Sequence, residues 1–101
     1  MKEPTMIFRA LADPTRRQIL QALKEKDMRA GDIVDLFTMT GPSVSRHLSI
    51  LKAAGLVSER REGNAIIYTL EPEKLSLCLS DFLSAVCPTE LVQKHRRRNK
   101  K

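Results

Sequence analysis

Hydrophobic residues recur at helical spacing in the first part of the chain, where they form three short apolar stripes. Each stripe repeats every three or four residues, and this spacing predicts three amphipathic helices. The stripes are Met6, Ile7, Ala10 and Leu11; Ile19, Leu20 and Leu23; and Ile33, Val34, Leu36 and Phe37. Asp13 and Pro14 separate the first two, as a helix cap and a first-turn proline would. Residues 28–31 interrupt the pattern before the third helix.

The next apolar stripe predicts a fourth helix between Thr40 and Gly55. Its members lie within a narrow arc at about 100° per residue, and they are Val44, Leu48 and Leu51. Thr40 is placed to cap this helix, Pro42 suits its first turn, and Gly55 is the expected terminator. One side of the helix therefore faces a core and the other faces solvent.

A β-hairpin and a last helix are predicted after the fourth helix. Residues 56–60 and 65–70 have the composition of strands, and residues 62–64 form the turn between them. Pro72 opens a helix that continues through about Val86, with the apolar stripe Leu75, Leu79, Phe82, Leu83 and Val86. The predicted order is α-α-α-α-β-β-α. This is a mostly α-helical fold with a β-hairpin wing, the winged helix-turn-helix.

The outward side of the fourth helix carries short hydroxyl and basic side chains. Such a helix fits the DNA major groove, and a basic hairpin can reach the adjacent backbone or minor groove. Arg46 is the side chain best suited to a guanine edge, and Arg61 and Asn64 are favoured over Arg60 in the wing. The predicted DNA-binding residues are Thr40, Ser43, Ser45, Arg46, His47, Ser49, Arg61 and Asn64. Double-stranded DNA is the expected partner.

Some of these residues have a plain structural alternative. His47 lies about 60° from the centre of the core side, where a phosphate contact and a packed boundary position are equally compatible with the pattern. Glu59 and Glu62 would repel phosphate if they faced the DNA. Arg16 and Arg17 are expected on a solvated face of the second helix, although a helix N-terminus can also approach phosphate.

The net charge of +6 is concentrated at the C-terminus. Residues 1–93 contain 12 basic and 12 acidic side chains, so every further cation lies in residues 94–101. We expect one DNA-binding and dimerisation domain over residues 1–93, followed by a basic tail over residues 94–101. The tail has no apolar residue, which predicts disorder, and its charge should raise non-specific DNA affinity.

Composition argues against several other classes of protein. The chain has no apolar run of about 18 residues, and its N-terminus lacks the layout of a secretory signal, so no membrane contact is expected. Two cysteines are too few for a disulfide framework, which favours a cytoplasmic protein. Asp27, Asp32 and Asp35 have no neighbouring His or Cys, and there is no glycine-rich phosphate loop. We therefore expect no enzymatic activity.

The last helix carries more apolar surface than one small body needs. This surplus predicts a homodimer through the first and last helices, with the interface residues Met6, Ile7, Leu75, Cys78, Leu79, Phe82 and Val86. Cys78 and Cys87 are roughly 13 Å apart along a continuous helix, too far to join within one straight helix. A thiol-responsive repressor switched through Cys78 and Cys87 between subunits remains an alternative, as does a winged-helix module that binds protein.

Two segments resemble the ArsR (arsenic-repressor-like) family of bacterial winged-helix repressors. LADPTRRQILQALKEKDMRAGDIVDLF resembles that family's second and third helices, and GPSVSRHLSILKAAGLVSERREGNAIIYTL its recognition helix and wing. The resemblance covers roughly residues 5–85 and is strongest to the SdpR-like branch, which lacks the metal-binding cysteines. It implies a homodimer, paired through its first and last helices, that represses transcription by occupying operator DNA. The two-fold symmetry of such a dimer predicts a near-palindromic operator. A small-molecule inducer or protein partner is left open.

The sequence departs from the metal-sensing members of that family. Their thiolate cluster lies at the start of the third helix, where residues 28–31 offer no ligand, and Arg29 replaces the usual capping Ser or Thr. The last helix offers Asp81 but no histidine, and His95 lies beyond its end. Zinc takes four N, S or O ligands, so we expect no metal site and no cofactor.

Overall fold

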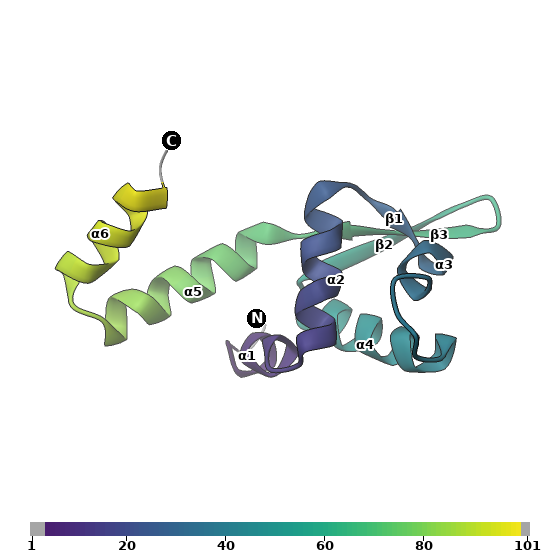
Figure 1. Cartoon of the computed structure of the whole chain (residues 1–101), viewed down its shortest axis with the longest axis horizontal. Coiled ribbons are helices and arrows are strands. Elements are labelled where there is room, and N and C mark those ends of the chain that lie inside the picture. Colours follow the sequence, from purple (N-terminus) through teal and green to yellow (C-terminus); the bar gives the residue numbers. More distant parts are fainter. Residues whose placement is uncertain (1–3, 100–101) are drawn as a thin grey trace.

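Two groups of elements follow one another in the computed structural model, which describes the backbone of residues 4–99 and side chains through Lys94. The first group is α1 (Pro4–Leu11), α2 (Pro14–Glu25), β1 (Met28–Arg29), α3 (Ala30–Val34) and α4 (Gly41–Ala53). The second group is β2 (Val57–Glu62), β3 (Ala65–Leu70), α5 (Pro72–Val86) and α6 (Thr89–Asn99). The predicted winged-helix order is confirmed, with β1 and α6 as additions. Figure 1 shows a body from which the hairpin projects on one side and α5 with α6 on the other.

Helix α2 begins at a side-chain cap, as the sequence predicts. The Asp13 carboxylate accepts hydrogen bonds from the backbone N–H groups of Thr15 at 2.7 Å and Arg16 at 3.2 Å, and Pro14 stands in the first turn. Burial would raise the pKa of Asp13, but the two backbone donors and the charge of Arg16 lower it below its ordinary 3.8. The cap therefore holds an ionised carboxylate at the positive end of α2.

The sheet has three antiparallel strands in the order β1-β3-β2. Strands β2 and β3 form the hairpin, with Glu62 opposite Ala65 at its tip, and Gly63 takes a left-handed turn conformation with φ of 61°. Strand β1 pairs its two residues with Tyr68 and Ile67 of β3. The sequence gives no sign of β1, because two residues carry no alternating pattern and the pairing depends on a distant strand.

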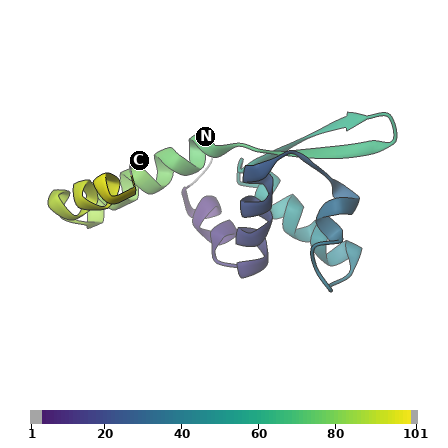
Figure 2. The same ribbon diagram turned by 45° about the horizontal axis from the view of Figure 1, so that its top comes forward.

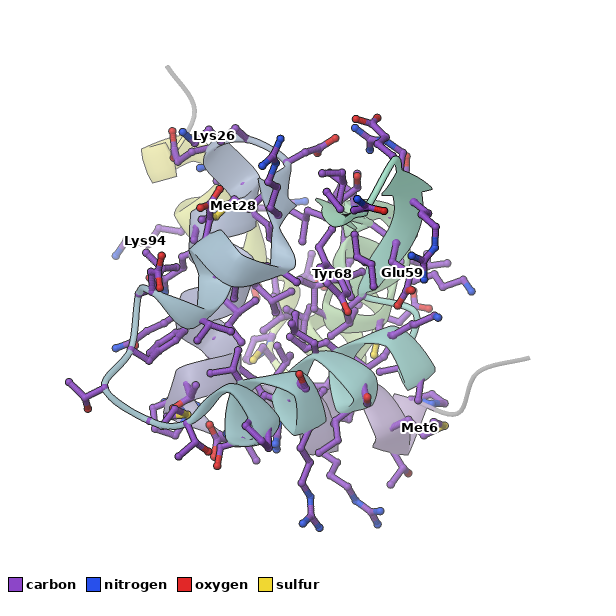
Figure 3. All side chains as sticks on the ribbon, turned by 90° about the vertical axis from the view of Figure 1, so that its right-hand side faces the viewer. Met6, Lys26, Met28, Glu59, Tyr68 and Lys94 are labelled. Carbon is purple, nitrogen blue, oxygen red and sulfur yellow. The ribbon has the colours of Figure 1, made fainter. Side chains whose placement is uncertain are left out.

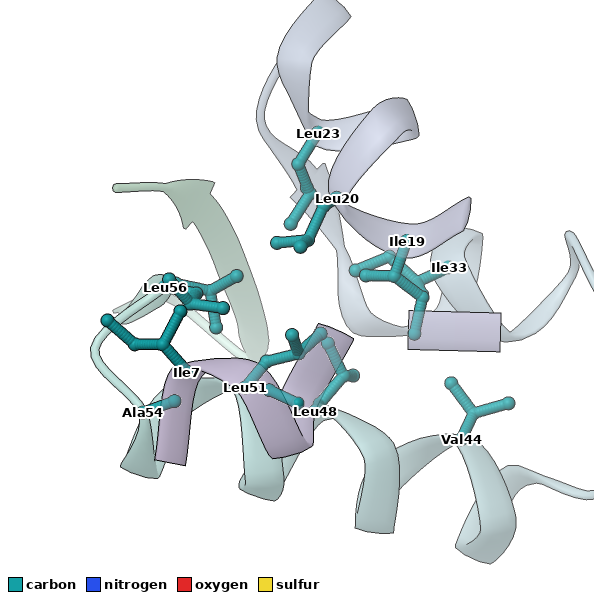
Figure 4. Packing of buried hydrophobic residues seen from close by; sticks show 12 residues of the cluster. Ile7, Ile19, Leu20, Leu23, Ile33, Val44, Leu48, Leu51, Ala54 and Leu56 are labelled. Carbon is teal, nitrogen blue, oxygen red and sulfur yellow. The ribbon is translucent and has the colours of Figure 1, made fainter. Parts of the chain in front are cut away.

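An aliphatic core fills the space between the helices and the hairpin. Figure 4 shows this packing, in which Ile19 lies beside Ile33 and Leu51 lies near Leu48. The largest fully buried side chains are Ile19, Ile33, Leu51, Leu56 and Val44. They come from α2, α3, α4 and the turn before β2, so the core joins the recognition helix to the rest of the body. Figure 2 shows α1 and α2 side by side, close to α4, in agreement with their contacts.

Two predictions from hydrophobic spacing are wrong. Ile7, predicted at a dimer interface, is only 4% exposed and packs in the core of the single chain, because α1 lies across α2 and α4. Leu36, predicted on the core face of the third helix, is 49% exposed. Helix α3 ends at Val34, and its N-cap Arg29 makes no side-chain capping hydrogen bond. Leu36 therefore lies beyond the end of the helix and does not follow its apolar stripe.

The predicted disordered tail also differs from the structure, because α6 continues to Asn99. Its first turn is fixed on Pro88, whose carbonyl accepts the N–H groups of Leu91 and Val92. Gln, Lys and Arg are strong helix formers, and Glu90 precedes Lys94 by four residues in the stabilising order. The backbone therefore shows no change at residue 94, and residues 100–101 lie outside the described range. No helix within residues 4–99 is both long and apolar enough to span a membrane.

Candidate nucleic-acid interface

The turn before α4 fixes the start of the helix as the sequence predicts. Thr40 Oγ1 accepts the backbone N–H of Ser43 at 3.3 Å and also donates to Ser43 Oγ at 3.1 Å. Pro42 lies in the first turn, and Gly55, with φ of 79°, ends the helix. Both predicted residues at this end, Thr40 and Ser43, are exposed but already bonded to each other. Their first role is to set the direction of the helix.

The outward side of α4 remains free of the core. Ser45, Arg46 and Ser49 are exposed, whereas Val44 and Leu48 on the other side are buried. No ion pair engages Arg46 among the described side chains, whereas Lys52, further along the same helix, pairs with Glu59 at 3.1 Å. Arg46 is therefore a cation in solvent, on a surface of hydroxyl groups.

His47 lies at the edge of this side and is half-buried. Its Nδ1 is 3.1 Å from Arg16 Nη1. Within the single chain, His47 therefore packs at the boundary of the core, which is one of the two positions that the sequence allows. The predicted solvated position of Arg16 is wrong, because this side chain is only 9% exposed. Arg16 lies three, four and seven residues before Ile19, Leu20 and Leu23, on the same stripe of α2. Helical spacing alone thus indicates its burial, whereas its charge suggests the opposite.

Arg17, unlike Arg16, lies in solvent as the sequence predicts. It is exposed and donates one hydrogen bond to the carbonyl of Leu11 at 2.7 Å. Two adjacent arginines in one helix therefore have different surroundings, because only one of them points along the apolar stripe.

The wing divides its charged residues into paired and unpaired ones. Arg60 donates to Glu62 at 2.7 Å, and to Asp27 and Thr69 at 3.1 Å each. The hydrogen bonds to Glu62 and Asp27 raise the pKa of Arg60 further above its ordinary value. Arg61 has no such partner among the described side chains. This arrangement agrees with the sequence-based preference for Arg61 over Arg60.

Glu59, the other acid of the wing, is also neutralised by neighbours. Lys52 pairs with it from α4, and Tyr68 lies opposite it across the hairpin, as Figure 3 shows. Burial, the charge of Glu59 and a hydrogen bond to it raise the pKa of the Tyr68 hydroxyl. Asn64, at the tip, is exposed. The acids that would repel phosphate are thus engaged, while Arg61 and Asn64 remain accessible.

A family model described as a bacterial regulatory protein of the arsR family matches residues 13–59. The chain is 52% identical over 80 residues to the transcriptional repressor SdpR of Bacillus subtilis, covering 79% of this chain and 89% of SdpR. The chain belongs to the ArsR family. It is also 40% identical over 75 residues to the HTH-type transcriptional regulator KmtR of Mycobacterium tuberculosis, covering 74% of this chain and 58% of KmtR.

Solved structures agree with this family. The crystal structure of the ArsR family transcriptional regulator RHA00566 aligns with a TM-score of 0.76 at 25% identity, covering 97% of this chain and 100% of that chain. This ArsR-family chain is therefore a DNA-binding transcriptional regulator and not an enzyme. The similarity to SdpR agrees with the branch that the sequence indicates.

The predicted dimer residues fall into two groups in this ArsR-family chain. Leu75 and Cys78 are partly buried and pack against the core, so α5 is attached to the body at its beginning. Further along, Phe82 is exposed and contacts Phe8 of α1 edge to face, with ring centroids 5.2 Å apart. The large exposed apolar residues of α1 and α5 are Met6, Phe8, Leu77, Phe82, Leu83 and Val86. Leu79 is half-buried.

The two cysteines are free thiols at different positions on α5. Cys78 packs partly against the core, and Cys87 is the residue that ends the helix. Among the described side chains, no three His, Cys, Asp or Glu residues come together as a metal site would require. The side chain of His95 lies outside the described residues, as do those of the basic residues that follow it.

Proposed function

We propose that this ArsR-family regulator is a transcriptional repressor that occupies a near-palindromic operator as a homodimer and does not sense metals directly. The outward side of α4 is the observation that carries this proposal. Arg46 stands there in solvent without an acidic partner among the described side chains, beside Ser45 and Ser49. Arginine recognises guanine through paired hydrogen bonds, and serine hydroxyls bond to bases or phosphates.

The wing supports the same surface. Arg61 and Asn64 are accessible near the tip of the hairpin, while Glu59 and Glu62 are engaged by cations of the protein. A reading helix followed by an accessible basic hairpin matches the way in which winged helices contact the groove and the adjacent backbone. Arg61 would contact phosphate, and Arg46 would read a base edge.

The apolar side of α5 supports a homodimer. No residue of α5 is fully buried, and Leu77 and Val86 are 64% and 62% exposed. A second copy can cover this side by placing the same surface against itself, as two-fold dimers do. Such a dimer would place its two α4 helices about 34 Å apart, one turn of DNA, and therefore favour a near-palindromic site.

Among the described side chains no ligand set for a metal comes together, and this supports release by something other than a metal. Residues 28–31 contain no side chain that binds zinc, and Asp81 is the acid of α5 that lies within one turn of Cys78. Zinc, cadmium or arsenite at near-stoichiometric concentration is therefore expected to leave the complex with DNA intact. Release by metal that disappears in a Cys78→Ser, Cys87→Ser double variant would place this chain among the metal sensors.

The deciding experiment selects binding sites from random duplex DNA with the full chain. We expect two related half-sites about one helical turn apart. Arg46→Ala should then cost about 1–3 kcal/mol of affinity for the selected site, with little change on unrelated DNA. Lys52→Ala is the matched control, because Lys52 is a cation of the same helix that already pairs with Glu59. Failure to select any sequence, or an equal loss in both variants, would refute base reading by Arg46.

A further inference from the structure

Arg16 joins three helices through one guanidinium group. Its Nε donates to the carbonyl of Ala10 at 2.7 Å and its Nη2 to the carbonyl of Arg9 at 2.9 Å. Both carbonyls belong to the last turns of α1, which carry the negative end of that helix. The remaining Nη1 lies 3.1 Å from Nδ1 of His47 on α4. A buried cation thus connects the end of α1 with the edge of the recognition helix.

This contact fixes the hydrogen positions of the His47 ring. Arginine stays protonated in proteins and can only donate, so Nδ1 of His47 must accept the hydrogen bond. In a neutral imidazole whose Nδ1 accepts, the ring hydrogen is on Nε2. The hydrogen-bond network therefore assigns His47 as a neutral ring with an N–H donor at Nε2.

The Nε2 donor is not fully buried. No hydrogen bond within the described part of the chain uses it, and no buried polar side-chain atom there lacks a partner. Nε2 is consequently accessible, on a residue that is otherwise half-buried. His47 follows Ser43 by four residues and so lies one turn further along the same side of α4. The free donor is at the edge of the side on which Arg46 is exposed.

We propose that Arg16 is a positioning residue for DNA binding, which holds His47 so that its Nε2–H donates to a phosphate oxygen of the DNA backbone. This inference rests on the proposed function, because it requires that α4 faces DNA. A phosphate is the expected acceptor because phosphate oxygens lie at the rims of the groove, where the edge of an inserted helix passes. Arg16 itself stays buried and does not touch DNA.

Two variants of His47 distinguish the role of the Nε2–H donor from the role of the side chain in packing against Arg16. In His47→Asn, the amide takes the place of Nδ1 and can still accept from Arg16, but nothing replaces Nε2. In His47→Gln, the longer side chain brings an N–H near the position of Nε2. We expect His47→Asn to keep its melting temperature and to lose about tenfold in affinity on every DNA sequence, as for a hydrogen bond to a charged group. His47→Gln should keep part of the affinity, because it restores the donor to DNA but not the acceptor for Arg16.

The salt dependence gives a second readout. A neutral donor releases no counterion from DNA, so His47→Asn should shift the affinity without changing its slope against salt concentration. The same loss is expected for Arg16→Gln, and in the His47→Asn background Arg16→Gln should cause no further loss. Arg17→Gln is the matched control, because Arg17 also donates to an α1 carbonyl but does not contact His47. Arg17→Gln should leave the hydrogen bond from His47 to the phosphate intact.

The outcomes distinguish this inference from the proposed function. Equal affinity of His47→Asn and the unchanged chain, at equal melting temperature, would assign His47 to packing alone and overturn the inference. If Arg16→Gln does not fold, the comparison of His47→Asn with His47→Gln decides by itself. Failure of the unchanged chain to select any duplex would instead overturn the proposed function.

Discussion

The winged-helix body and the arm formed by α5 and α6 differ in what covers their apolar side chains. In the body, side chains from α1, α2, α3 and α4 bury one another, and Ile19, Ile33 and Leu51 are fully enclosed. In the arm, α5 has no fully buried residue, and Figure 1 shows it leading away from the body. Both regions have regular apolar stripes. The body is therefore stabilised from within, whereas the apolar side of α5 stays exposed in the single chain, where we propose that a second copy docks.

The largest expected effect is a loss of stability in the body. Leu51→Ala removes a side chain that is 0% exposed and contacts the core between α4 and its neighbours. We expect about 3–5 kcal/mol of lost unfolding free energy, since the cavity adds to the lost transfer energy. Denaturant unfolding at several protein concentrations measures it. The control is Leu36→Ala, an exposed leucine of the same body, for which a loss within about 0.5 kcal/mol is expected. Equal losses would mean that Leu36 is buried after all.

That pair of leucines also marks how far hydrophobic spacing predicts the fold. The stripes, the caps at Asp13 and Thr40 and the hairpin were all predictable, because each depends on residues close together in sequence. The burial of Ile7 and the exposure of Leu36 were not predictable in this way. They depend on which helices pack together and on where α3 ends, and the same spacing is compatible with a core or with an interface.

The candidate site was predictable to a similar extent. The exposed positions of α4 follow from the core stripe on its other side, so Ser45, Arg46 and Ser49 could be found from sequence. The contact between Arg16 and His47 joins residues 31 positions apart, and no local pattern contains it. Burial of Arg16 was indicated by its spacing from Ile19, but charge is a strong argument for exposure in the absence of a known partner.

The next effect should appear in the arm and depend on protein concentration. Phe82→Glu places a charge on the apolar side of α5, where a second copy is proposed to dock. We expect the dissociation constant of the dimer to rise at least about a hundredfold, because the carboxylate would be buried without a partner. Sedimentation across the micromolar range measures this. Ser84→Glu is the matched control, since a residue two positions away points to the opposite side of the helix. A monomer in the unchanged chain would contradict the proposed interface.

A smaller effect is expected from removing the N-cap side chain of a helix, and it should differ between α2 and α5. Asp13→Ala removes the side-chain cap of α2 and should cost about 1 kcal/mol at neutral pH. The α5 N-cap residue Glu71 makes no capping hydrogen bond, so Glu71→Ala is expected to have less effect on helix stability.

The Asp13 cap should also be sensitive to acid. Because the folded state lowers the pKa of Asp13 below 3.8, its contribution is present above that value and is lost as the pH falls through the folded pKa. Asp13→Asn keeps a capping oxygen but cannot be titrated, so it should lose less stability than the unchanged chain below about pH 4. Thermal unfolding between pH 2 and pH 7 measures the difference in stability between the two chains. The whole contribution of the cap is about 1 kcal/mol of unfolding free energy, so the difference cannot exceed that size by much. Identical acid profiles would show that Asp13 stays protonated or unbonded.

The smallest effect concerns the wing, which projects like the arm but exposes charge where the arm exposes apolar surface. Arg61→Gln should weaken binding to all DNA sequences alike and reduce the slope against salt concentration by about one, as for the loss of one phosphate contact. Arg60→Gln is the matched control in the adjacent position, because Arg60 is already held by Glu62 and Asp27. Its slope should stay unchanged. A larger change in slope for Arg60 than for Arg61 would mean that the wing turns its paired face to the DNA, with Glu62 released from Arg60 on binding.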